Sequence, residues 1–157
     1  MRPEPSPGRD PRHDSRHDSR HDIEGRDDVA ALVTDFYGRA FADPLIGPIF
    51  TDVARMDLAA HLPIMCDFWE SVLFRTGAYR RNALAVHRDL HAKVPLTPAH
   101  FERWHALWTA TVDDRHAGER AEHAKVQAGR VADSILRRLT EPEDRALLTI
   151  ERGQRSE

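Results

Sequence analysis

Residues 97–111 have the sequence TPAHFERWHALWTAT, which predicts an amphipathic α-helix. Thr97 is a favoured N-cap residue, and Pro98 would take the first helical position, where the N–H that proline lacks would be unpaired anyway. Large side chains then recur every three or four residues, which is the spacing of one helix face: Phe101, Trp104, Trp108 and Thr111. We therefore expect a helix here that buries an aromatic face.

The same spacing recurs along most of the chain. It predicts helices over residues 28–41, from an N-cap at Asp57 to Gly77, over residues 82–91 in a shorter piece, and over residues 119–139. Pro63 lies early in the second of these helices and could break its first turns. Residues 44–50, with two prolines and a glycine, predict an apolar loop packed on the core. Since no segment alternates as a strand does, the predicted fold class is all-α.

Length and composition favour one domain with a modest core. The chain has 157 residues, a formal net charge of −3 and 40% apolar residues. It has no apolar run of the ~20 residues that span a bilayer, and no secretory signal, so we expect no membrane partner and a cytoplasmic location. Opposite charges are interspersed, which argues against nucleic acid as a partner. Cys66 is the only cysteine, which excludes an internal disulfide and c-type haem attachment.

Both ends of the chain are polar. We predict a disordered tail over residues 1–26, a domain over residues 27–140 and a C-terminal extension over residues 141–157. The N-terminal tail contains a repeat, Arg-His-Asp-Ser, that places His13, His17 and His21 four residues apart. Such a repeat could chelate nickel or zinc, although a solvated tail is the favoured explanation.

Several polar side chains fall on the predicted apolar faces: Tyr37, His61, Trp104, and His87 or His91. Each one alone has an ordinary explanation as a hydrogen-bonded core residue. Together, an iron-binding histidine on one wall and a tyrosine, a tryptophan and a second histidine on others are typical of a haem pocket with a polar distal side. Two alternatives stay open at this point: a cytochrome in which His61 also binds the iron, and a helical interaction module without haem.

Five motifs occur in the order and approximate spacing of one known family. They are Asp35-Phe36-Tyr37, the turn at residues 45–50, His61 followed by Phe68-Trp69, His87-Arg88-Asp89-Leu90, and residues 100–104. In these motifs, residues 28–139 resemble the group III truncated haemoglobins. The resemblance implies a two-over-two helical sandwich that holds a non-covalent haem b.

The resemblance also assigns roles to individual residues. It makes His87 the proximal iron ligand, with Tyr37, His61 and Trp104 on the distal side. Met65 would touch the haem, and Phe50 and Phe68 would supply apolar walls. His91 is the second choice for the proximal ligand, because it lies four residues after His87 on the same helix face.

The predicted function follows from a five-coordinate iron. Its open position would bind oxygen, nitric oxide, carbon monoxide or peroxide. A haem-dependent peroxidase or a nitric oxide dioxygenase is the alternative within the same fold, and either would need an unidentified reductase. The chain shows no flavin fingerprint of its own.

Overall fold

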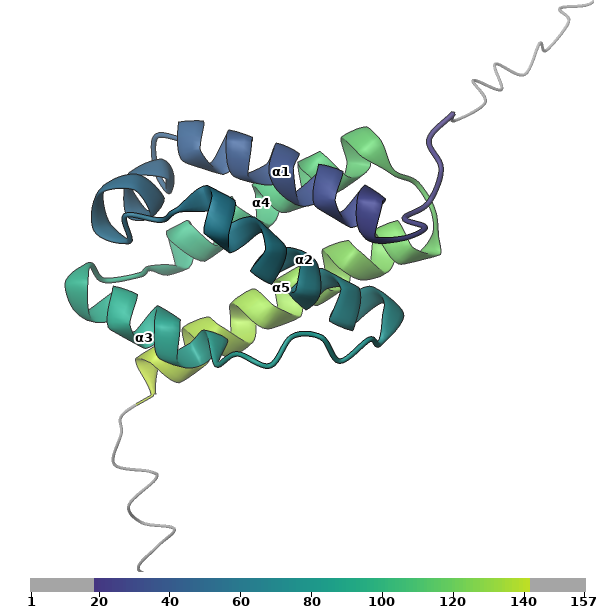
Figure 1. Cartoon of the computed structure of the whole chain (residues 1–157). Helices are drawn as coiled ribbons and strands as arrows, with labels where there is room; N and C mark the ends of the chain where they lie inside the picture. Colours follow the sequence, from purple (N-terminus) through teal and green to yellow (C-terminus); the bar gives the residue numbers. More distant parts are fainter. Residues whose placement is uncertain (1–18, 142–157) are drawn as a thin grey trace, which may run out of the picture.

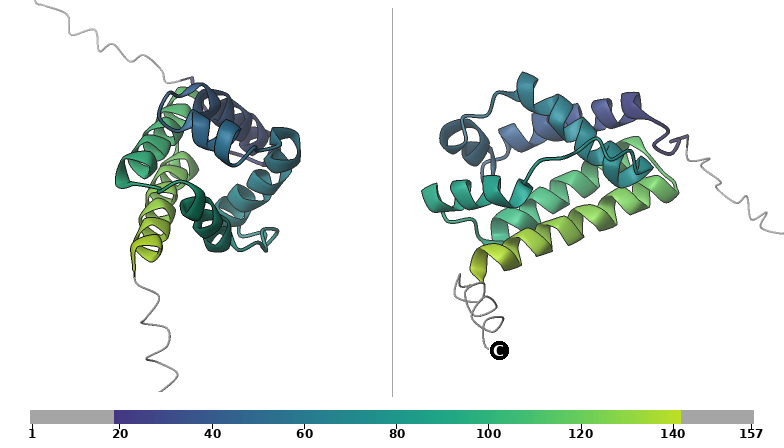
Figure 2. Two further views of the ribbon diagram at one scale, coloured as in Figure 1. Left: turned by 90° about the vertical axis from the view of Figure 1, so that its left-hand side faces the viewer. Right: turned by 60° about the horizontal axis from the view of Figure 1, so that its bottom comes forward.

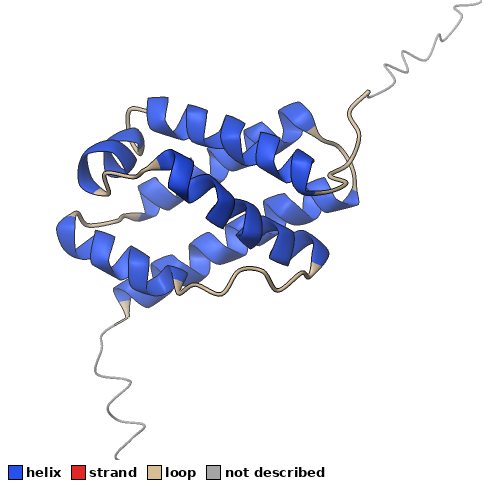
Figure 3. Cartoon of the chain, viewed as in Figure 1, coloured by secondary structure: helices blue, strands red, loops and turns tan. Residues whose placement is uncertain are grey.

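The computed structural model describes residues 19–141, and within that range every regular element is helical and no strand occurs (Figure 3). The elements are α1 (Arg26–Ala42), the π-helical turn η1 (Ile49–Val53), α2 (Leu58–Phe74), α3 (Ala83–Lys93), α4 (Pro98–Arg115) and α5 (Glu119–Thr140). The predicted all-α class is confirmed. None of the described helices has the length and apolar character needed to cross a membrane.

The four long helices form two layers. One layer is the pair α1 and α2, which pack against each other, and the other is the pair α4 and α5 (Figure 1). Contacts between α1 and α4 and between α2 and α5 hold the layers together. The short helix α3 packs against α5 (Figure 2). This is the two-over-two arrangement expected from the sequence.

Two tryptophans join the layers in the core. Trp69 of α2 and Trp108 of α4 stack with ring centroids 4.2 Å apart and an interplanar angle of 11°. Both side chains are buried, and the Trp108 indole N–H donates to the Ala124 carbonyl of α5 at 3.2 Å. The partner for this indole matters because a buried N–H without one is destabilising. The aromatic face predicted for residues 97–111 is thus the face that packs α4 on α2 through Trp69 and on α5 through Ala124.

The turn between α1 and η1 is built around a buried carboxylate. Asp43 accepts the backbone N–H groups of Leu45 and Ile46 at 2.9 and 3.0 Å, and the Arg103 guanidinium of α4 donates to it at 2.6 Å. Burial alone would raise the pKa of Asp43, but these hydrogen bonds outweigh it and hold the pKa below its usual value. The predicted loop does pack on the core, since Ile46 is buried. It differs from the prediction in ending as the helical turn η1.

Helix boundaries differ from the sequence predictions at α2. This helix ends at Phe74 rather than at Gly77, because Arg75 adopts the left-handed conformation with φ 56° and closes it early. Pro63 lies inside α2 without breaking it. Proline removes only the hydrogen bond to the Ala59 carbonyl, and Ala59 is exposed to water. At α4, by contrast, the predicted N-cap Thr97 and first residue Pro98 are confirmed.

The last part of the stretch predicted as a disordered tail over residues 1–26, directly before α1, packs on the domain. Ile23 is completely buried, and Asp22 accepts the backbone N–H groups of Arg120 and Ala121 at the start of α5. A buried apolar side chain, a helix-capping carboxylate and backbone hydrogen bonds such as that from the Ala117 N–H to the His21 carbonyl hold this stretch on the domain. His13, His17 and the rest of the predicted tails, residues 1–18 and 142–157, lie outside the described residues.

Candidate functional site

A cavity of about 440 Å³ lies between the two layers and α3. Its lining is mainly apolar and comes from all five α-helices and from η1. This volume is within the range of roughly 300–1,000 Å³ that is typical of cofactor and ligand sites. Of the eight site residues predicted from the sequence, seven line this cavity: Tyr37, Phe50, His61, Met65, Phe68, His87 and Trp104.

Tyr37 of α1 and His61 of α2 form a polar pair on the wall of the cavity. The Tyr37 hydroxyl lies 3.0 Å from His61 Nε2, and the two rings meet edge to face with centroids 5.4 Å apart. Burial raises the pKa of Tyr37 well above its usual value, so the phenol keeps its proton. Burial and the nearby Arg81 cation lower the pKa of His61, so its imidazole is neutral near pH 7.

Aromatic rings surround this pair and connect it to α4. Tyr37 lies edge to face against Phe36 and Phe50, at centroid distances of 5.1 and 5.9 Å. Phe36 in turn meets Trp104 at 5.9 Å. The Trp104 indole N–H donates to no other group among residues 19–141. The cavity wall thus offers a second N–H or O–H donor beside Tyr37.

His87 of α3 presents one ring nitrogen without a protein partner. Its Nδ1 lies 2.7 Å from the Ala83 carbonyl oxygen, and because a carbonyl can only accept, Nδ1 carries the proton and donates. The lone pair of the neutral ring is therefore on Nε2, which has no hydrogen-bond partner in the described part of the chain. Metal-binding histidines are oriented in this way, with the second nitrogen donating to a carbonyl.

His91, the second choice for the proximal ligand, is arranged differently. The backbone N–H of Leu96 donates to His91 Nδ1 at 2.9 Å, so in the neutral ring the proton resides on Nε2. His91 is also absent from the described residues that line the cavity. The two histidines share a helix but have opposite tautomers, and only His87 has a lone pair available for a metal in the cavity.

The cavity includes residues that the sequence did not point to. The lining includes two basic side chains, Arg81 and Lys93, and also His100. Apolar contributions also come from outside the predicted helix faces: Ile46, Ile49, Met56, Tyr79 and Leu96. The turn at residues 45–50 was predicted to pack on the core, which accounts for Ile46 and Ile49. Tyr79 and Leu96 lie in connecting segments without periodicity, so no sequence signal marked them.

The comparison with solved structures yields the fold class. The chain is similar to the crystal structure of a group III truncated haemoglobin from Campylobacter jejuni, with a TM-score of 0.68 and 22% sequence identity. The match covers 78% of this chain and 96% of that one. No model of a protein family and no curated protein sequence matches the chain. The structural likeness shows that the chain has the fold of a truncated globin.

Proposed function

We propose that this chain is a haem b protein that binds oxygen and other small diatomic ligands, with His87 as the proximal ligand of the iron. The observation that carries the proposal is the hydrogen bond from His87 Nδ1 to the Ala83 carbonyl, which leaves Nε2 free in the cavity wall. A ferrous haem held by one imidazole supplies an open coordination position for oxygen, carbon monoxide or nitric oxide.

The lining of the cavity fits a porphyrin. Phe50, Met65 and Phe68 supply apolar surface for the macrocycle and keep water from it. Arg81 and Lys93 supply positive charge for the carboxylates that haem b carries at its edge. Both the apolar surface and the rim of cations are therefore present in one cavity.

The distal donors support the binding of a ligand that acquires negative charge. Tyr37 stays protonated because of its burial, and when its oxygen accepts from an Nε2–H of His61, its O–H remains to donate to the bound ligand. The indole N–H of Trp104 is a second donor. Preorganised donors stabilise developing charge strongly where water is excluded. We expect these two groups to slow the release of oxygen.

His61, the third residue proposed for the distal side, bears on how many protein ligands the iron has. His61 Nε2 is engaged with the Tyr37 hydroxyl at 3.0 Å. If His61 were a second axial ligand through Nε2, it would have to give up this hydrogen bond. The pairing therefore favours a single protein ligand, His87, over a cytochrome arrangement with two.

The ligand assignment is tested by replacing each of the two histidines of α3 separately with glycine. We expect His87→Gly to lose the five-coordinate ferrous spectrum of the full chain reconstituted with haem b, and added imidazole to restore it. His91→Gly is the matched control, on the same helix, and should keep the spectrum. Loss of the spectrum in His91→Gly, with retention in His87→Gly, would assign the iron to His91 instead.

A further inference from the structure

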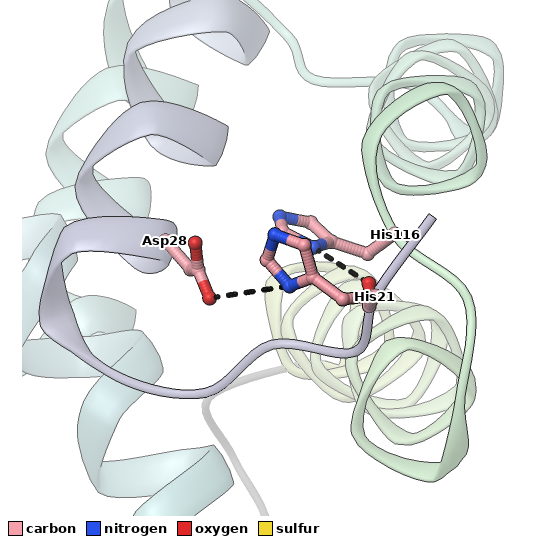
Figure 4. A group of neighbouring side chains, drawn as sticks. All are labelled: His21, Asp28 and His116. Carbon is pink, nitrogen blue, oxygen red and sulfur yellow. Dashed lines mark hydrogen bonds and ion pairs between the residues drawn. The ribbon is translucent and has the colours of Figure 1, made fainter. Parts of the chain in front are cut away.

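Three side chains from separate parts of the chain meet outside the cavity, where the segment before α1 packs on the link between α4 and α5. They are His21 of that segment, Asp28 in the first turn of α1, and His116, the C-cap of α4 (Figure 4). Each offers one ligand atom, and these atoms all lie within 4.8 Å of one another. We propose that His21, Asp28 and His116 form a binding site for a divalent transition-metal cation such as Zn²⁺.

The strongest evidence is an unpaired nitrogen in the interior. His116 is only 4% exposed, and its Nε2 is buried without a hydrogen-bond partner, a unique case among the buried side-chain nitrogen and oxygen atoms of residues 19–141. Its Nδ1 lies 3.1 Å from the His21 carbonyl oxygen and therefore donates to it. The lone pair of the neutral ring thus lies on Nε2. Buried polar atoms are nearly always paired, and an ion is one of the few explanations for an exception.

His21 has the same tautomer as His116. Its Nδ1 lies 2.7 Å from the Asp22 carbonyl oxygen, so this nitrogen also donates and Nε2 also carries the lone pair. A backbone carbonyl on the second ring nitrogen is the usual way in which proteins orient a metal-binding histidine. Two neighbouring imidazoles, with centroids 5.3 Å apart, are oriented in that way here.

Asp28 completes the donor set with a carboxylate. Its Oδ2 accepts the backbone N–H of Glu24 at 2.9 Å and lies 3.8 Å from His21 Nδ1, and its other oxygen remains for a ligand. Figure 4 shows the carboxylate facing the two imidazoles. Two histidines, one carboxylate and a water are a tetrahedral set suited to Zn²⁺, whereas Mg²⁺ prefers oxygen ligands throughout.

The geometry needs only a small adjustment. Bonds of about 2.1 Å in a tetrahedron place ligand atoms roughly 3.4 Å apart. The three ligand atoms here lie within 4.8 Å of one another, so they would have to move closer together. The side chain of His21 is 59% exposed and can rotate to close the site. A bound cation would then fasten the segment before α1 to α1 and to the end of α4.

This site gives His21 a role other than the one suggested by the repeat. In the sequence, His21 is the last of three histidines spaced for chelation by the repeat itself. In the structure, its partners are Asp28 and His116, which are distant in sequence. The folded site and the repeat therefore make different predictions, because only the repeat depends on His13 and His17.

Equilibrium dialysis of the untagged full chain against buffered Zn²⁺ tests the proposal. We expect one saturable Zn²⁺ per chain, and affinity weakened by more than about tenfold in His21→Ala, Asp28→Asn and His116→Gln. His123→Ala removes an exposed imidazole of α5 and should change the affinity less than about twofold, as should the double variant His13→Ala, His17→Ala. Zn²⁺ should raise the melting temperature of the wild type but not that of Asp28→Asn, and Mg²⁺ should raise neither.

Two results would overturn the site. One is unchanged Zn²⁺ affinity in His21→Ala or Asp28→Asn, which change residues that are not fully buried and decide the matter even if His116→Gln does not fold. The other is loss of Zn²⁺ binding in the double variant of His13 and His17, which would assign the metal to the sequence repeat. Neither result bears on the proposed haem site.

Discussion

Single hydrogen bonds determine what each histidine of the cavity region can do. His87 donates through Nδ1 to a carbonyl and keeps a free Nε2, whereas His91 accepts a backbone N–H and keeps its proton on Nε2. His61 Nε2 is occupied by the Tyr37 hydroxyl. In the proposed haem site the same residue type would therefore serve as metal ligand, as connector to a loop and as distal partner, and the choice depends on the groups nearby.

Removing a distal donor should speed oxygen release. Tyr37→Phe and Trp104→Phe keep the rings that fill the cavity wall and delete only the O–H or N–H. Because a hydrogen bond to a charged group contributes about 1.5–3 kcal/mol, we expect each variant to raise the oxygen dissociation rate roughly tenfold or more, as measured by stopped-flow mixing. Tyr79→Phe is the control, since Tyr79 lines the same cavity but is not one of the two proposed donors, Tyr37 and Trp104. Unchanged rates in both variants would contradict the distal role.

At the scale of elements, the connection between α1 and η1 depends on Asp43. This carboxylate satisfies two backbone N–H groups of the turn and binds Arg103 of α4. The turn carries Ile46, Ile49 and Phe50 into the wall of the cavity. Gly47 is required in it, because a Cβ there would lie 2.5 Å from the Phe41 carbonyl oxygen. One buried acid thus positions part of the site.

Replacing this acid should destabilise the protein in a way that depends on pH. We expect Asp43→Ala to lower the free energy of unfolding by about 1–3 kcal/mol at pH 7, because buried N–H groups lose their partner. The folded pKa of Asp43 is below its ordinary value of 3.8, so its contribution is present above that pH and is lost as pH falls further. Denaturant unfolding of both proteins from pH 7 to pH 3 measures this. Asp52→Ala, at an exposed acid of η1, is the control, and an equal loss there would contradict the account.

The sequence predicted the elements well where local signals were sufficient. Thr97 and Pro98 marked the start of α4, and helical spacing together with the family resemblance identified the seven predicted site residues that line the cavity. It could not place the end of α2, because an arginine rather than a glycine takes the left-handed conformation there. It could not choose between His87 and His91 on one helix face. That choice depends on the Ala83 carbonyl and on how Leu96 folds back, which spacing does not encode.

At the scale of the whole molecule, the segment before α1 joins the two layers at the end where α4 meets α5. Asp22 caps α5, His116 donates to the His21 carbonyl, and Ile23 is buried in the core between them. Sequence composition suggested a tail here because charged residues dominate it. Ile23, Asp22 and the His21 carbonyl together hold the segment on the fold, because each finds a complementary partner in α4 or α5 or in the core.

This segment should therefore contribute measurably to stability. We expect Ile23→Ala to lower the free energy of unfolding by about 2–5 kcal/mol, the usual loss for a fully buried isoleucine. Val126→Ala, at a position of α5 that is 50% exposed, should change it by less than about 0.5 kcal/mol. Chemical denaturation followed by circular dichroism compares the two. If Ile23→Ala were as stable as the wild type, the packing of the segment before α1 would not contribute to stability as expected.

In the proposed function, the cavity between the layers holds haem b with one protein ligand. Titration of the full chain with haem b, followed by reduction and addition of carbon monoxide, tests it by visible absorption. We predict saturation at one haem per chain and a five-coordinate ferrous spectrum that shifts on addition of carbon monoxide. Absence of saturable binding would indicate a helical module without haem, and a spectrum with two strong axial ligands that carbon monoxide leaves unchanged would contradict the open coordination position.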